Sequence, residues 1–137
     1  MVGVVGNAAK VSDGHAPPTI RFITRKWPPA VGGMETYSAK IAEGVRQHGA
    51  IDLIALPGRR SGREPTTLAL IRFGLATAMQ LLVAREVKVV HVADLASWPF
   101  AWIASIRHPR SRIVISAHGS DLSFADRAGW RSKLYGA

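Results

Sequence analysis

Apolar residues along this chain occur in two patterns: short runs rich in β-branched residues, and longer stretches with helical spacing. The short runs occupy residues 20–24, 51–56, 87–92 and 112–117. The helical stretches occupy residues 34–48, 66–86 and 97–106, and a last helix is expected at 125–135. Strand and helix therefore alternate. This order predicts an α/β fold, a Rossmann-like parallel sheet with helices on both faces.

The first predicted strand leads into the first predicted helix through a glycine loop. Pro28 and Pro29 end the strand, and Gly32 and Gly33 come directly before the helix. The first turn of a helix offers unpaired N–H groups and a partial positive charge, and residues without Cβ let an anionic or polyhydroxylated ligand come close. The same two glycines also fit a plain turn between strand and helix, so the rest of the chain must decide.

Polar residues follow two further predicted strands. They are Asp94, His118, Gly119, Ser120 and Asp121. In parallel sheets, ligands bind outside the carboxyl ends of the strands, so we expect these residues to meet the glycine loop at one edge. His118 either contacts a ligand hydroxyl or phosphate or is a structural histidine bonded to backbone. Asp121 could form an Asx turn or accept from a sugar hydroxyl, and Asp94 could cap the next segment.

The spacing of His91 and Asp94 equals that of His118 and Asp121, and this repetition raises a metal site as an alternative. In a continuous strand, however, His91 and Asp94 would point to opposite faces, so we expect no metal. The glycine fingerprint of dinucleotide-binding proteins, the phosphate-binding P-loop motif and the serine nucleophile elbow are all absent from the sequence. Three common enzyme classes are therefore not supported.

Composition limits the partners. The 137 residues are enough for one domain, and the absence of cysteine excludes disulfides and favours an intracellular location. Eighteen Lys and Arg against nine Asp and Glu give a net charge of +9, which attracts nucleic acid, a phospholipid surface or a phosphorylated substrate. The basic residues are scattered and lack interleaved aromatic residues, so we do not expect nucleic-acid binding.

Residues 66–86 form the one segment apolar enough to be mistaken for a membrane span. Arg72 lies within it, and a charge in the middle of a span is costly. We therefore expect a helix that packs on the core or lies on an interface, rather than one that crosses a bilayer.

Three motifs in this order resemble the N-terminal domain of retaining glycosyltransferases of family four, which have the GT-B fold. They read WPPAVGGMETYSAKIAEGVRQHG, VKVVHVAD and RIVISAHGSDL, and the resemblance extends over about residues 20–122. It implies transfer of a sugar from a nucleotide-sugar donor to a glycan or lipid-linked acceptor, with retained configuration and no cofactor or metal. It also implies that Gly32 and Gly33 line the cleft, that Glu35 lies in the first helical turn, and that His118 faces the transferred sugar as the catalytic residue.

The donor-binding second domain of that family has no counterpart in these 137 residues. We therefore expect an arm at 1–18 and a partial acceptor-side domain at 19–137, inactive without a C-terminal partner domain. A cytoplasmic location is expected, with basic residues near 59–63 or 107–112 available to hold the domain on an anionic membrane face. Two alternatives stay open: a non-catalytic Rossmann-like module that binds a phosphorylated ligand, and a basic membrane-surface protein.

Overall fold

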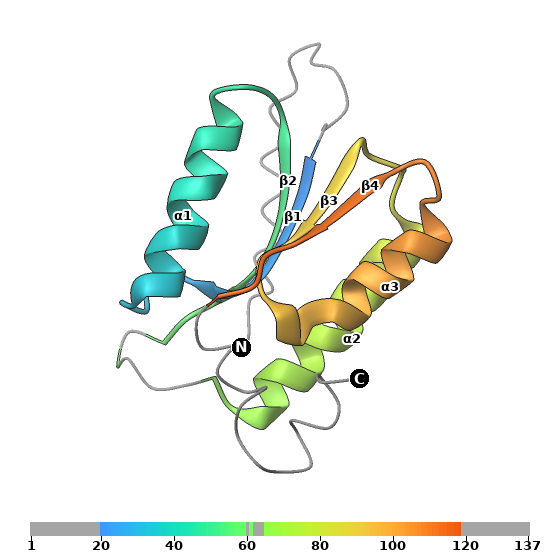
Figure 1. The fold of residues 1–137 in the computed structure, drawn as a ribbon. Coiled ribbons are helices and arrows are strands. Elements are labelled where there is room, and N and C mark those ends of the chain that lie inside the picture. Colours follow the sequence, from blue (N-terminus) through green and yellow to red (C-terminus); the bar gives the residue numbers. More distant parts are fainter. Residues whose placement is uncertain (1–19, 60, 62–64, 119–137) are drawn as a thin grey trace.

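The computed structural model describes residues 20–59, 61 and 65–118. This part of the chain contains one four-stranded sheet, and all of its strands run parallel in the order β2-β1-β3-β4 (Figure 1). The strands are β1 (Ile20–Trp27), β2 (Ile51–Pro57), β3 (Val89–Val92) and β4 (Arg112–Ile115). The helices are α1 (Gly33–Arg46), α2 (Thr67–Val83) and α3 (Trp98–Arg107), and a 3-10 turn, η1 (Leu95–Ser97), precedes α3. The predicted α/β fold, a Rossmann-like parallel sheet with flanking helices, is confirmed.

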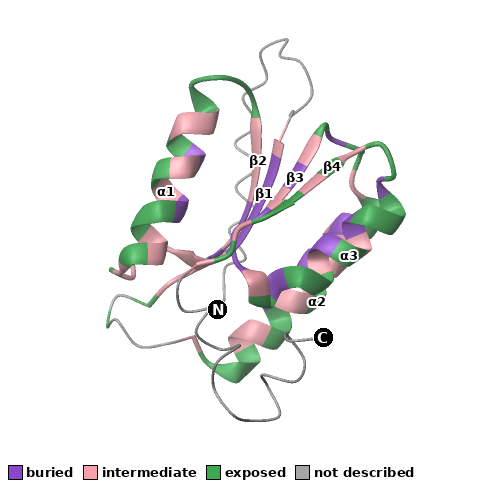
Figure 2. Ribbon diagram, viewed as in Figure 1, coloured by how far each residue is buried: buried purple, intermediate pink, exposed green. Residues whose placement is uncertain are grey.

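The helices cover the two faces of the sheet unequally. α1 lies against β1 and β2 on one face, whereas α2 and α3 lie side by side over the other face (Figure 1). The core is between the sheet and the α2–α3 layer, where Ile23, Val90 and Val92 are fully buried (Figure 2). Ala101 and Ala104 of α3 are buried against this core, because small side chains let a helix come close to a sheet.

The nearly continuous apolar run at 51–56 predicts a strand that is buried along most of its length, and this prediction is wrong. Only Ile54 and Leu56 of β2 are buried. β2 is an edge strand of the sheet, so one flank and part of its length face solvent. Its run of apolar residues could not be distinguished by composition from that of a central strand.

The expectation that α2 packs on the core is confirmed, but only for one side of the helix. Phe73, Thr77 and Leu81 recur every four residues and face the sheet, and they are its buried residues. Among the described residues, no helix is both long and apolar enough to cross a membrane. The arm at 1–18 and the helix expected at 125–135 lie outside the described residues.

Candidate functional site

The strand order reverses between β1 and β3. These two strands are neighbours in the sheet, although β2 lies between them in sequence. From β1 the chain moves outward to β2, and from β3 it moves outward to β4 on the opposite side. The pairing continues past β3, since the Ala93 N–H donates to the Ile23 carbonyl at 2.9 Å. The carboxyl ends of β1 and β3 therefore flank the position where ligands bind in sheets of this kind.

The first turn of α1 opens onto this edge. Gly32 is the N-cap residue with extended backbone (φ −177°, ψ 170°) and has no side chain to cap the helix, and Glu35 places a carboxylate in the first turn. A Cβ on Gly33 would meet no described atom within 4 Å, and one on Gly32 would meet the flexible end of Glu35. Neither contact with the described residues nor backbone strain therefore requires these glycines. What they do provide is access to the N–H groups of the first turn.

The loop before α1 is anchored to the end of β2. The Gly58 N–H donates to the Trp27 carbonyl at 2.8 Å. A Cβ on Gly58 would collide with Ala30 and lie 2.7 Å from the Trp27 oxygen, so this position has no room for a side chain. This close backbone approach fixes the path of the loop that ends at the diglycine.

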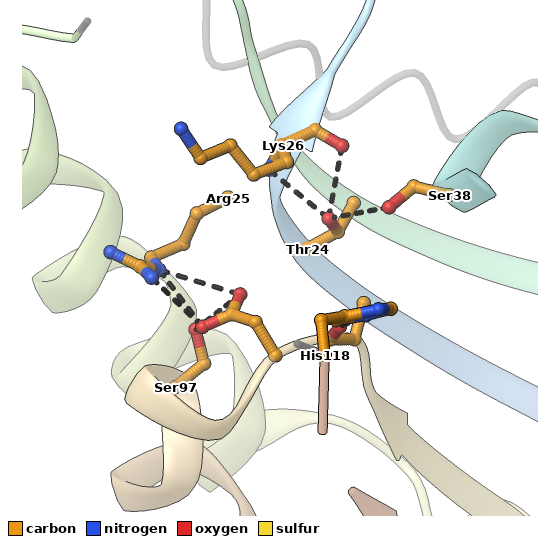
Figure 3. Close-up of polar contacts among 8 residues, drawn as sticks. Thr24, Arg25, Lys26, Ser38, Ser97 and His118 are labelled. Carbon is orange, nitrogen blue, oxygen red and sulfur yellow. Dashed lines mark hydrogen bonds and ion pairs between the residues drawn. The ribbon is translucent and has the colours of Figure 1, made fainter. Parts of the chain in front are cut away.

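At the same edge, on the side of the sheet that α2 and α3 cover, Asp94 is the centre of a buried polar cluster. Arg25 donates to its carboxylate from Nη2 at 2.9 Å and from Nε at 3.2 Å, and the Ser97 hydroxyl lies 3.0 Å from both oxygens (Figure 3). Asp94 and Ser97 are each 1% exposed. Asp94 occupies the N-cap position of η1 without a side-chain bond to backbone N–H. The carboxylate therefore holds Arg25 and Ser97, and its predicted contact with substrate stays a prediction.

On the α1 face, His118 lies beside Tyr37 of α1. The two rings meet edge to face, with centroids 4.8 Å apart. His118 Nε2 donates to the Ala93 carbonyl at 2.8 Å, and because a carbonyl only accepts, Nε2 carries a hydrogen. This bond matches the structural alternative for His118, and it also orients the ring next to the first turns of α1.

A second polar pair connects α1 to the sheet on this face. The hydroxyls of Thr24 and Ser38 lie 3.2 Å apart and are buried (Figure 3). The Thr24 oxygen also accepts from the Lys26 N–H at 3.1 Å. The Thr24–Ser38 bond fixes α1 along the direction of β1, and it thereby positions the N-terminus of α1 at the edge.

His91 lies deeper on the α1 face. Its Nε2 is 2.8 Å from the Ser116 hydroxyl, and its ring meets Phe22 edge to face at 5.0 Å. Burial lowers the pKa of His91, and the nearby positive charge of protonated His118 lowers it further. His91 therefore favours the neutral form.

The proposed metal alternative finds no support in the described part of the chain, where no three His, Asp or Glu side chains gather to hold an ion. His91 contacts Phe22, whereas Asp94 bonds Arg25 on the other side of the sheet. The odd spacing of His91 and Asp94 predicted this divergence. The other predicted pair involves Asp121, which lies outside the described residues.

Gly32, Gly33, Glu35, Asp94 and His118 thus all lie at the edge formed by the carboxyl ends of the strands, Asp94 on the side covered by α2 and α3 and the others on the α1 side, and their expected roles in binding stay predictions. Gly119, Ser120 and Asp121 lie outside the described residues, so their expected roles stay predictions.

Sequence reasoning missed Arg25 and Tyr37. Tyr37 had a detectable signal, because it lies four residues after Gly33 and so sits one turn above the helix start.

Comparisons of the chain with protein-family models, curated proteins and solved structures gave no match. The resemblance to glycosyltransferases therefore rests on the three sequence motifs.

Proposed function

We propose that this chain is the acceptor-side part of a retaining glycosyltransferase, which moves a sugar from a nucleotide-sugar to a glycan or lipid-linked acceptor. One observation supports the proposal above all. The N-cap residue of α1 is a glycine, which has no side chain to cap the helix, and this helix N-terminus lies at the sheet edge together with His118, which contacts Tyr37 of the same helix.

Each group at this edge has a role in the proposed reaction. The oriented N–H groups of the first turn of α1 stabilise negative charge on the departing diphosphate, and Gly32 and Gly33 let that diphosphate come near. His118 positions the transferred sugar rather than attacking it. Its bond to the Ala93 carbonyl and its contact with Tyr37 hold the ring in one orientation, which positioning requires.

The decisive test is turnover by the protein expressed from its complete reading frame. Release of nucleoside diphosphate is measured against a panel of nucleotide-sugars for wild type, His118→Ala and the control His48→Ala. His48 is exposed at the opposite end of α1, where its Nδ1 lies 2.8 Å from the Gly44 carbonyl. We expect His118→Ala to lower kcat by about 100-fold, and His48→Ala to leave it within about twofold.

The non-catalytic alternative rests on the same helix N-terminus, which can bind a phosphorylated ligand without any reaction. Calorimetric titration with a nucleoside diphosphate separates the two. Gly33→Ala places a methyl group where no described atom lies within 4 Å and should weaken binding by about tenfold, whereas Gly44→Ala, equally uncrowded but in the last turn of α1, should not. Binding that depends on Gly33 without turnover of any donor would support the binding module. Turnover unaffected by His118→Ala would exclude the proposed role of this histidine.

A further inference from the structure

The outward side of α2 is as apolar as its inward side. Exposed Leu68, Ile71, Leu75 and Met79 recur every three or four residues, opposite the buried stripe that faces the sheet. Leu75 is 66% exposed and Met79 is 60% exposed. A helix on the surface of a soluble domain normally carries polar residues on this side, and a helix that is apolar all round is normally covered.

α3 extends the same surface. It lies beside α2, and its outward positions carry Trp98, Trp102 and Ile106, of which Trp102 is 60% and Ile106 is 64% exposed (Figure 2). We call the whole the α2–α3 face. It is defined by Leu68, Leu75, Met79, Trp98, Trp102 and Ile106.

The charged side chains on α2 and α3 themselves are all basic, and the nearest exposed carboxylate, Glu86, follows α2 and pairs with Arg110. Neither α2 nor α3 contains an acidic residue. Arg72 is exposed within the apolar stripe of α2, and Arg107 ends α3, where its Nε donates to the Leu82 carbonyl at 2.9 Å. The surface therefore combines large apolar side chains, two indole rings and arginine, and the chain as a whole carries a charge of +9.

We propose that the α2–α3 face binds the surface of a bilayer that contains anionic lipids. Tryptophan suits the boundary between headgroups and acyl chains, because its ring is apolar and its N–H is polar. The leucine, methionine and isoleucine side chains enter the outer acyl region, and Arg72 reaches lipid phosphate along its apolar stem. A second copy of the chain is a poorer occupant, because two surfaces of net positive charge repel each other.

The α2–α3 face lies close to one part of the candidate site. α3 begins at Trp98, directly after Ser97, which bonds Asp94 at the sheet edge. A bilayer on the α2–α3 face would thus lie next to the Asp94 side of the edge, whereas His118 and the N-terminus of α1 lie on the other side of the sheet. Delivery of a lipid-linked acceptor from that bilayer rests on the proposed function, whereas the attachment itself does not.

Sedimentation of the 137-residue chain with lipid vesicles tests the attachment directly. We expect binding to phosphatidylcholine vesicles containing about one-third phosphatidylglycerol, weaker binding as salt rises, and little binding to phosphatidylcholine alone. The double variant Leu75→Gln with Trp102→Gln should bind at least about tenfold more weakly. Arg72→Gln should bind about fivefold more weakly, whereas Lys40→Gln, which removes the same charge from exposed α1, should change binding by less than about twofold.

Because Leu75, Trp102 and Arg72 are exposed, the variants should keep the wild-type circular dichroism spectrum and urea midpoint. Failure to bind anionic vesicles at low salt would overturn the proposal. Equal loss in Arg72→Gln and Lys40→Gln, with no loss in the double variant, would show that net charge alone attracts the chain, and would also overturn it. A wild-type dimer in the absence of lipid that Leu75→Gln converts to monomer would assign the face to a second copy instead.

Discussion

Two polar clusters lie on opposite faces of the same sheet edge, and they differ in how completely the fold uses their hydrogen-bonding groups. In the first, Arg25 and Ser97 occupy both oxygens of a carboxylate that is 1% exposed. In the second, α1 begins at Gly32, which has no capping side chain, and the described residues do not require a glycine there or at Gly33. The first cluster, around Asp94, stabilises the fold at this edge. The second offers donors to a ligand, so it is the better place to look for function.

We predict that the cluster around Asp94 contributes more to the stability of the fold than the N-terminus of α1 does. Asp94→Ala removes the anion that pairs with Arg25 and leaves the buried Ser97 hydroxyl without its acceptor. We expect a loss of about 2–4 kcal/mol in the free energy of unfolding, less than for a fully buried pair because the Arg25 side chain is 31% exposed. Urea denaturation followed by circular dichroism measures this loss.

Glu43→Ala is the matched control for Asp94→Ala. It also removes a carboxylate paired with arginine, but the Glu43–Arg46 pair is 3.9 Å apart and exposed on the surface of α1. We expect a change within about 0.5 kcal/mol. Similar losses in the two variants would mean that burial of the Asp94 cluster contributes nothing, and the distinction between the two faces of the edge would fail.

The Asp94 cluster also shows where sequence reasoning stops. The helices and strands follow from local periodicity, and the place of Asp94 after a strand follows from the order of elements. The Arg25–Asp94 pair does not follow, because its residues are 69 positions apart and meet only when β3 lies beside β1. Alternating elements leave strand order open, and for the same reason the exposure of β2 at the sheet edge was missed.

The loop that leads to the N-terminus of α1 gives a second prediction, with a smaller expected effect. In Gly58→Ala the new methyl group meets Ala30 and the Trp27 carbonyl, so either β2 or the loop must move. We expect a loss of about 1–3 kcal/mol, seen as a fall in Tm of about 5–15 °C. In Gly44→Ala the methyl group meets nothing within 4 Å among the described residues, and a helix interior favours alanine. This control should gain about 0.5–1 kcal/mol. Stabilisation by both substitutions would show that the loop is not held by close contact at Gly58.

The smallest effect expected is a pH dependence of stability that arises from His91 on the α1 side of the sheet. The pKa of His91 is lowered in the folded state, first by burial and then by His118. Below about pH 6.5 the unfolded chain therefore takes up a proton on His91 more readily than the folded chain does. Stability is complete above this pH and falls as the pH decreases toward the lowered value.

His91→Gln removes this proton uptake while keeping a polar side chain beside Ser116. Thermal denaturation of wild type and variant between pH 5 and pH 8 should give a shallower fall in Tm on acidification for the variant, since only the wild type binds the extra proton when it unfolds. The difference between the two proteins should be constant near pH 8, where His91 is neutral in both states, so that region serves as the control. Parallel profiles over the whole range would mean that His91 titrates alike in folded and unfolded chains. In that case the contacts of His91 with Phe22 and Ser116 would not exclude water from its ring, and the α1 face near His91 would be as open as the helix N-terminus beside it.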